Sequence, residues 1–136
     1  MINLDTNILV RIVKTDPDVP KQSEYARKIV RKAWESETAI FITSITIVEF
    51  CWVMLKSYKI KREEVADFID YLLALDLAEF EHRIEVMKAL SDFRGGKGDF
   101  ADYLIARIGE AHGCEITWTF DQALSDKSLF EIKRGT

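Results

Sequence analysis

Four acidic residues stand at points of the sequence where packing alone does not explain a charge. Each follows a strand-like run or interrupts a largely apolar helical run: Asp5, Glu49, Asp102 and Asp121. A carboxylate in apolar surroundings must be paired, hydrogen-bonded or bound to a metal ion. Carboxylates brought together repel one another, and a hard divalent cation removes that repulsion because it prefers oxygen ligands. The four acids therefore predict a metal centre suited to hydrolysis of phosphodiester bonds by metal-activated water.

Each acid also has a simpler structural interpretation. Asp5 begins an Asp-Thr-Asn run that can cap a helix, and Asp102 lies in a first helical turn, where acids favour the helix dipole. Glu49 can face solvent or pair with a lysine, and Asp121 can be a turn residue. Their joint placement at strand ends and on two helices is the stronger indication.

Short apolar runs that alternate with helical patterns must position these acids. Strands are expected over 1–4, 39–42, 77–80, 114–119 and 129–133, and helices over 6–14, 21–36, 43–58, 61–76, 83–93 and 99–112. The prolines of 16–20 predict a turn, the glycines of 94–98 a flexible loop, and Gly113 ends the last helix. In helix 21–36 the residues expected to face the core are Tyr25, Ile29, Ala33 and Trp34.

This alternation predicts an α/β protein, a three-layer α/β/α sandwich around a small parallel sheet. The length of 136 residues fits one domain spanning 1–136. Ligands of such sheets bind beyond the carboxyl ends of the strands. Asp5 and Asp121 are expected at those ends.

Charge, cysteine content and hydrophobic run length limit which binding partners and cellular locations are expected. A net charge of −4 gives no bulk attraction to nucleic acid, so binding must depend on a local basic surface or on metal ions. Cys51 and Cys114 both lie in apolar runs and are expected to be buried free thiols, which fits a cytoplasmic location. No apolar stretch reaches the length of a membrane span, and the first residues do not resemble a signal peptide.

Four segments resemble the motifs of the PIN-domain family, and in particular the VapC-type toxins of bacterial and archaeal toxin–antitoxin pairs. The segments are 4–7 (LDTN), 43–49 (TSITIVE), 99–106 (DFADYLIA) and 119–121 (TFD), in the family's order and at its spacing. The resemblance covers essentially the whole chain. It implies a PIN-like nuclease domain in which the four acids hold one or two Mg²⁺ or Mn²⁺ ions and are catalytic.

The resemblance further implies an endoribonuclease that acts on RNA, is inhibited by a cognate antitoxin protein in a type II toxin–antitoxin system, and forms a homodimer. Supporting roles around the carboxylates fall to Thr6, Asn7, Asp99 and Thr119. The basic residues expected to contact the RNA backbone are Arg11, Lys14 and Lys97. The basic stretch 56–62 is a second candidate, for which a solvated helix end is the simpler interpretation.

Three alternatives remain beside this interpretation. A haloacid-dehalogenase-like phosphatase also places an aspartate after its first strand, but Asn7 stands where that class needs a second aspartate. A non-catalytic PIN scaffold would usually lack one or more of the acids that are present here. A housekeeping RNA-processing nuclease would share the same active site and differ in its biological role.

Overall fold

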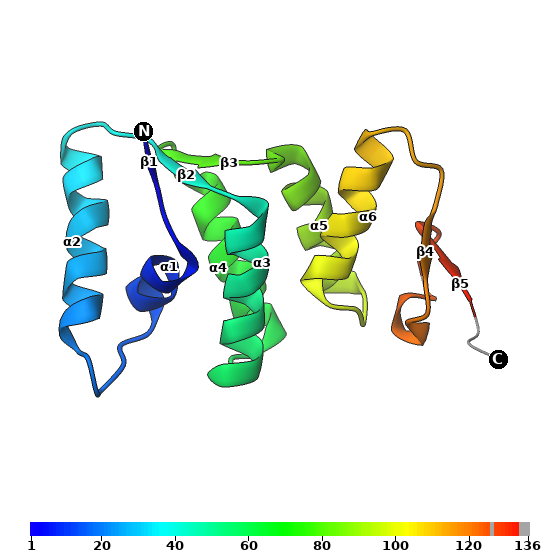
Figure 1. The fold of residues 1–136 in the computed structure, drawn as a ribbon, viewed down its shortest axis with the longest axis horizontal. Coiled ribbons are helices and arrows are strands. Elements are labelled where there is room, and N and C mark those ends of the chain that lie inside the picture. Colours follow the sequence, from blue (N-terminus) through cyan, green and yellow to red (C-terminus); the bar gives the residue numbers. More distant parts are fainter. Residues whose placement is uncertain (126, 134–136) are drawn as a thin grey trace. The chain divides into compact units, whose positions relative to one another are not determined.

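The computed structural model describes residues 1–125 and 127–133 (Figure 1). The chain divides into two compact units, residues 1–81 and the chain from His82 onward. The described strands form a three-stranded sheet in the first unit and a two-stranded sheet in the second. The α/β class is confirmed, and the one-domain organisation stays a prediction.

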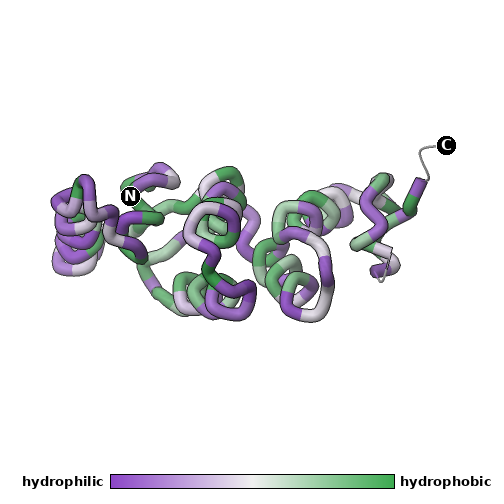
Figure 2. The backbone as a smooth tube through the Cα atoms, turned by 90° about the horizontal axis from the view of Figure 1, so that it is seen from below, coloured by the Kyte–Doolittle hydropathy of each residue, from purple (hydrophilic) through white to green (hydrophobic). Residues whose placement is uncertain are grey.

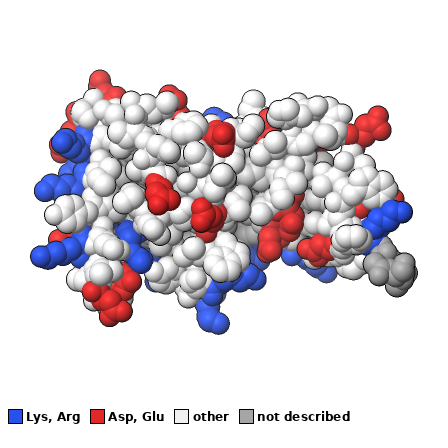
Figure 3. Space-filling model, viewed as in Figure 1, with Lys and Arg blue, Asp and Glu red and all other residues white. Residues whose placement is uncertain are grey.

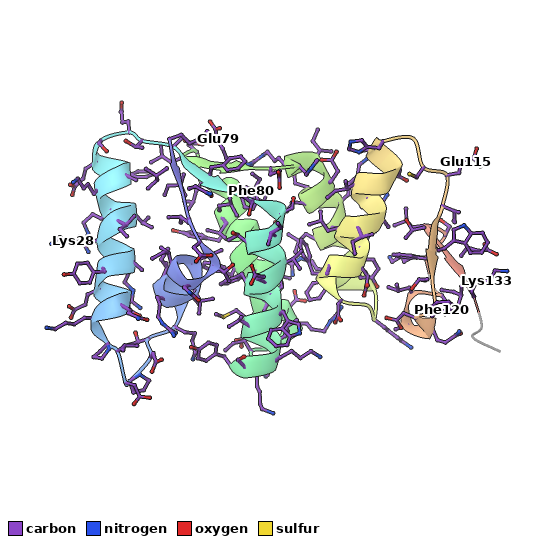
Figure 4. All side chains as sticks on the ribbon, in the orientation of Figure 1. Lys28, Glu79, Phe80, Glu115, Phe120 and Lys133 are labelled. Atoms are coloured by element: carbon purple, nitrogen blue, oxygen red, sulfur yellow. The ribbon has the colours of Figure 1, made fainter. Side chains whose placement is uncertain are left out.

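The first unit is built on a parallel sheet. Strands β1 (Ile2–Asn3), β2 (Ile40–Ile42) and β3 (Ala78–Phe80) pair in the order β1-β2-β3. Ile40 stands opposite both Ile2 and Ala78. Along β3, Ala78 and Phe80 are buried and Glu79 is exposed, as the period of a strand requires (Figure 4). Because the strands are parallel, their carboxyl ends meet at one edge of the sheet.

Four α-helices flank this sheet: α1 (Thr6–Val13), α2 (Lys21–Glu35), α3 (Ser44–Trp52) and α4 (Arg62–Ala74). Helix α1 packs against α2 and α3, and α4 packs against β3. The core of the unit contains fully buried Leu9, Ile47, Phe50 and Ile69. The ring of Phe50 lies 5.1 Å from that of Phe68, which joins α3 to α4. The expected positions of these helices are therefore confirmed to within a few residues.

Helix α2 packs through a stripe of small residues. The prediction that Tyr25 and Trp34 face the core is wrong, since their side chains are 66% and 61% exposed. The buried residues of α2 are Ser23, Ala26 and Ala33. In Figure 2 the coils of α2 are accordingly mainly purple. Small side chains let two helices approach closely, so this stripe faces the core in place of the stripe with the larger aromatics.

Helix α3 continues into a short π-helical turn, η1 (Val53–Ser57). The Tyr58 N–H donates to the Val53 carbonyl at 3.2 Å, and the Ile60 N–H donates to the Met54 carbonyl at 2.9 Å. The turn packs against α4 and buries Met54. It sets the direction in which the chain leaves α3.

The second unit joins two helices to a small parallel sheet. Helix α5 (Arg83–Gly95) packs against α6 (Phe100–Ala111), and β4 (Thr117–Thr119) pairs with β5 (Phe130–Ile132). A 3₁₀ turn, η2 (Gln122–Leu124), lies between the two strands. The Phe93 and Phe100 rings meet edge to face at 6.1 Å, and Tyr103 meets Phe130 in the same way.

A bidentate ion pair links the two helices of this unit. The Arg107 guanidinium donates to both carboxylate oxygens of buried Asp92, at 2.7 and 2.9 Å. These hydrogen bonds raise the pKa of Arg107 further above its usual value. Arg107 also donates to Glu110 at 3.0 Å. Two parallel hydrogen bonds between charged groups make this a strong polar contact between α5 and α6.

The glycine segment before α6 is packed. Helix α5 extends through Gly95, and the buried Gly98 N–H donates to the Tyr103 hydroxyl at 2.9 Å. A Cβ at Gly96 would overlap that hydroxyl, and a Cβ at Gly98 would overlap Leu124. The flexible loop expected over 94–98 is thus reduced to a short connection in which glycine permits close approach.

The two cysteines differ. Cys51 is buried in α3, and burial raises the pKa of its thiol to about 12. Cys114 is exposed, so the prediction that both are buried is wrong. Cys114 follows Gly113, which ends α6 with the expected positive φ of 91°, and the chain leaves the helix there toward the surface.

Within residues 1–125 and 127–133, none of the helices combines the length and the apolar character needed to cross a bilayer.

Candidate metal centre

Asp5 lies at the carboxyl edge of the first sheet. It follows β1, and its Oδ1 accepts a hydrogen bond from the Thr6 N–H at 2.8 Å, so it caps α1. The capping interpretation made from the sequence is therefore part of its role. Among the described residues its hydrogen bonding uses Oδ1 alone, and the side chain is exposed. Capping and metal binding are compatible for this carboxylate.

Thr6 brings a second acid beside Asp5. Its side chain is only 6% exposed, and its Oγ1 donates to Glu49 Oε1 at 3.2 Å. Glu49 comes from α3, 43 residues further along the chain, and its side chain is exposed. The structure thus places Asp5 and Glu49 on either side of one buried threonine. Figure 3 shows red side chains within a largely uncharged surface over α1 and α3.

Thr46 fixes the relative position of these two acids, and no role was predicted for it. The Thr43 hydroxyl accepts from the Thr46 N–H at 3.1 Å and so caps α3. It donates to Thr46 Oγ1 at 3.1 Å, and that oxygen donates to the Leu4 carbonyl at 3.3 Å. Leu4 directly precedes Asp5. The signal available in the sequence is a polar residue three positions before Glu49 in an apolar run.

The acids of the second unit occupy two helix starts. Asp102 lies in the first turn of α6, and its Oδ2 accepts from the Asp99 N–H at 3.2 Å. Asp121 follows β4, and its Oδ1 accepts from the Ala123 N–H at 2.9 Å, which caps η2. The Asp121 N–H donates to Thr119 Oγ1 at 3.1 Å. Thr119 therefore holds the backbone from which the Asp121 side chain projects.

The pKa of Asp102 is raised above its usual value. Partial burial is the largest cause, and the negative charges of Asp99 and Asp121 raise the pKa further. The hydrogen bond from the Asp99 N–H acts in the opposite direction. Ionised Asp102 is therefore disfavoured by its surroundings. A cation beside it would remove the repulsion from its two neighbours.

The donor chemistry of these residues fits a hard divalent ion, since every candidate ligand is a carboxylate oxygen. The first unit supplies Asp5 and Glu49, and the second supplies Asp102 and Asp121 with Asp99 nearby. Within the part of the chain that the structure describes, no group of three or more His, Cys, Asp or Glu side chains is gathered closely enough to hold a metal ion.

The predicted RNA-contacting residues have different surroundings. Arg11 Nη1 donates to the Tyr58 hydroxyl at 2.7 Å, and its other nitrogens donate to Gln22 and Asp16. Lys14 Nζ lies 5.7 Å from the centre of the Tyr58 ring. Lys97 is exposed. Arg11 therefore has a structural role in the first unit in addition to the predicted one.

The family model of the PIN domain matches residues 2–128, and the chain belongs to the PIN-domain family. The match includes all four acids. PIN domains are typically nucleases that depend on Mg²⁺ or Mn²⁺. No curated protein matches the chain. The family predicted from the sequence motifs is thus confirmed, and the VapC-type assignment stays a prediction.

Proposed function

We propose that this PIN-domain protein is a Mg²⁺- or Mn²⁺-dependent endoribonuclease whose ligands are Asp5, Glu49, Asp102 and Asp121. The observation that carries the proposal is that Asp5 and Glu49, which come from separate motifs of the sequence, both accept hydrogen bonds from Thr6. The raised pKa of Asp102 beside Asp99 and Asp121 supports it, because clustered acids are a hallmark of functional sites.

A bound divalent ion would activate water and stabilise the negative charge that develops on the phosphate. The protein's own side chains hold the carboxylates for it. Thr6 donates to Glu49, and Thr119 accepts from the backbone of Asp121. Asp102 must be ionised to bind a cation, and its surroundings make that ionisation harder without one. The acids are thus arranged to favour binding of a cation.

Cleavage of a labelled RNA in the presence of Mg²⁺ or Mn²⁺ tests the proposal. We expect the wild type to cleave internally and EDTA to stop it. Asp5→Asn and Asp102→Asn should each slow cleavage by at least about 100-fold, since even outer-shell changes lose about 10- to 100-fold. Asp18→Asn, at an exposed acid in the turn before α2, is the matched control. A wild type that binds no Mn²⁺ and leaves RNA intact would show a scaffold instead.

The finer proposal is a toxin of a type II toxin–antitoxin system, which forms a homodimer and is inhibited by an antitoxin protein. It rests on the resemblance of the four motifs. The first unit supports protein binding, since an apolar hollow of about 160 Å³ is bordered by the exposed aromatics Trp34 and Tyr71. We expect expression to arrest growth and Asp102→Asn to abolish the arrest. Unaltered growth would favour a housekeeping nuclease.

A further inference from the structure

The small sheet of the second unit turns two large aromatic side chains outward. Trp118 is 60% exposed and Phe120, the residue after β4, is 74% exposed. The alternate residues Thr117 and Thr119 are half-buried, and Phe130 opposite Thr117 is buried. The two aromatics therefore share the outward face of this sheet.

The neighbouring strand adds two charged residues to that face. Trp118 stands opposite Glu131, and the Lys133 N–H donates to the Thr119 carbonyl at 2.8 Å. Lys133 Nζ lies 5.3 Å from the centre of the Trp118 ring. Figure 4 shows Phe120 beyond the end of β4 and Lys133 beyond the end of β5. The face thus combines two exposed rings with a cation held over one of them.

We propose that Trp118 and Phe120 form a stacking platform for unpaired bases of the RNA substrate, with Lys133 contacting the adjacent phosphate. The inference rests on the proposed endoribonuclease function and assigns to these two side chains the binding of the substrate's bases. Phe120 directly precedes Asp121, and Thr119 holds the backbone of Asp121. A base stacked on Phe120 is therefore bound by the residue adjacent to a proposed metal ligand.

The strengths of the competing interactions favour a base over the lysine. An ammonium over an exposed ring contributes about 2- to 5-fold in an equilibrium constant. A base stacked on an aromatic side chain contributes about 5- to 150-fold. A base can therefore displace Lys133 from the Trp118 ring. The released ammonium is then available for a phosphate, an attraction that weakens with salt.

Unpaired RNA fits this face better than a duplex does. The flat faces of paired bases are already stacked on their neighbours, whereas an unpaired base exposes its face to a side chain. Lys133 supplies the charge that complements a phosphate, and its position at the rings places that charge beside the stacked base. The platform therefore selects loops and single strands as substrate.

Fluorescence anisotropy with a labelled single-stranded RNA of about eight nucleotides tests this inference. The full chain carries Asp102→Asn so that the RNA stays intact. We expect Trp118→Ala and Phe120→Ala each to weaken binding by about 5- to 150-fold. Tyr25→Ala removes an equally exposed ring on α2 and should leave the affinity unchanged. Lys133→Ala should lower the slope of log affinity against log salt by about 0.7.

Conservative variants separate stacking from folding. Phe120→Trp should restore binding, whereas Phe120→Leu should not, because leucine keeps apolar bulk and lacks a flat ring. A duplex of the same sequence should bind the Trp118 and Phe120 variants as tightly as it binds the parent. Parental affinity in both alanine variants would overturn the platform. So would a change from dimer to monomer in sedimentation equilibrium without a loss of RNA binding, which would show a protein interface.

Wild-type cleavage, measured alongside, keeps the two proposals apart. If the wild type cleaves RNA and the alanine variants bind with parental affinity, the platform fails and the nuclease stands. If the wild type binds RNA through Trp118 and Phe120 but cleaves none, the nuclease fails and the platform stands as an RNA-binding site.

Discussion

The acids of the two units are arranged by different means. In the first unit, neutral hydroxyl groups organise them: Thr6 donates to Glu49, and Thr46 fixes Leu4 next to Asp5. In the second unit, Asp102 has a raised pKa and lies within the field of Asp99 and Asp121. One pair is therefore linked through neutral hydroxyl groups, whereas partial burial and charged neighbours keep the pKa of Asp102 raised despite the hydrogen bond from the Asp99 N–H.

In the proposed metal centre, the two pairs of acids would contribute to metal binding in different ways. Donated hydrogen bonds position the carboxylates of the first unit without an ion, which would favour the affinity of the proposed centre through geometry. The negative charges beside Asp102 in the second unit disfavour its ionised form without an ion, which would favour the affinity of the proposed centre through electrostatics. Changes in the two units should therefore have different signatures.

The largest expected effect is a loss of stability when the ion pair between α5 and α6 of the second unit is broken. Arg107→Ala leaves the buried carboxylate of Asp92 without its bidentate partner. We expect the free energy of unfolding to fall by about 3–5 kcal/mol, measured by urea denaturation. Lys88→Ala, at an exposed residue of α5, is the control. A loss below about 1 kcal/mol would mean that α5 and α6 do not depend on this pair.

A smaller effect is expected from the hydroxyl bridge of the first unit. Thr6→Val keeps the shape of a buried side chain and removes the donor to Glu49. Mn²⁺ affinity, measured by isothermal titration calorimetry, should fall by about 10- to 100-fold. Stability should fall by about 1 kcal/mol. The control is Thr38→Val, which removes a half-buried hydroxyl that hydrogen-bonds Ser36 and should leave Mn²⁺ affinity unchanged. An unchanged Mn²⁺ affinity in Thr6→Val would mean that the hydrogen bond from Thr6 to Glu49 has no role in metal binding.

The smallest effect concerns the repulsion in the second unit. Asp121→Asn removes one of the charges that raise the pKa of Asp102, so that pKa should move down toward its usual value. Carboxyl-carbon NMR titration of the metal-free protein measures the shift directly. Asp18→Asn is the control. An unchanged pKa of Asp102 in Asp121→Asn would mean that the charge of Asp121 does not raise it.

The same shift sets a dependence of stability on pH. Because the folded-state pKa of Asp102 is raised, its contribution to stability is present below the unfolded-state pKa and is lost as pH rises through the folded-state value. The metal-free wild type should therefore lose stability over that interval. In Asp121→Asn the loss should be smaller, which urea denaturation at a series of pH values can measure.

The periodicity of apolar residues predicted the helices and strands well, because these elements depend mainly on residues that are near one another in the sequence. The strand before Asp5, the cap at Thr43 and the end of α6 at Gly113 all lie where expected. Predictions that depended on tertiary packing were less successful. Tyr25 and Trp34 fit an apolar stripe, yet Ala26 and Ala33 fill the interface because α2 approaches closely.

The identities of the acids were readable from the sequence, whereas their connections were not. Nothing in the spacing of Thr6 and Glu49 predicts a hydrogen bond across 43 residues. The role of Thr46 depends on the carbonyl of Leu4, which only the pairing of β1 with β2 brings near α3. The motifs identified the acids and their order, whereas the hydrogen bonds through Thr6 and Thr46 were seen only in the structure.

The π-helical turn after α3 has a consequence for how the family can vary. In an α-helix each residue advances the chain by about 100° of rotation. Deleting one residue from Val53–Ser57 would restore the regular winding and swing Tyr58 away from Arg11, to whose Nη1 it now lies at 2.7 Å. A relative one residue shorter at this point would need another acceptor for that arginine. Chain length and the Arg11–Tyr58 pair should therefore be inherited together.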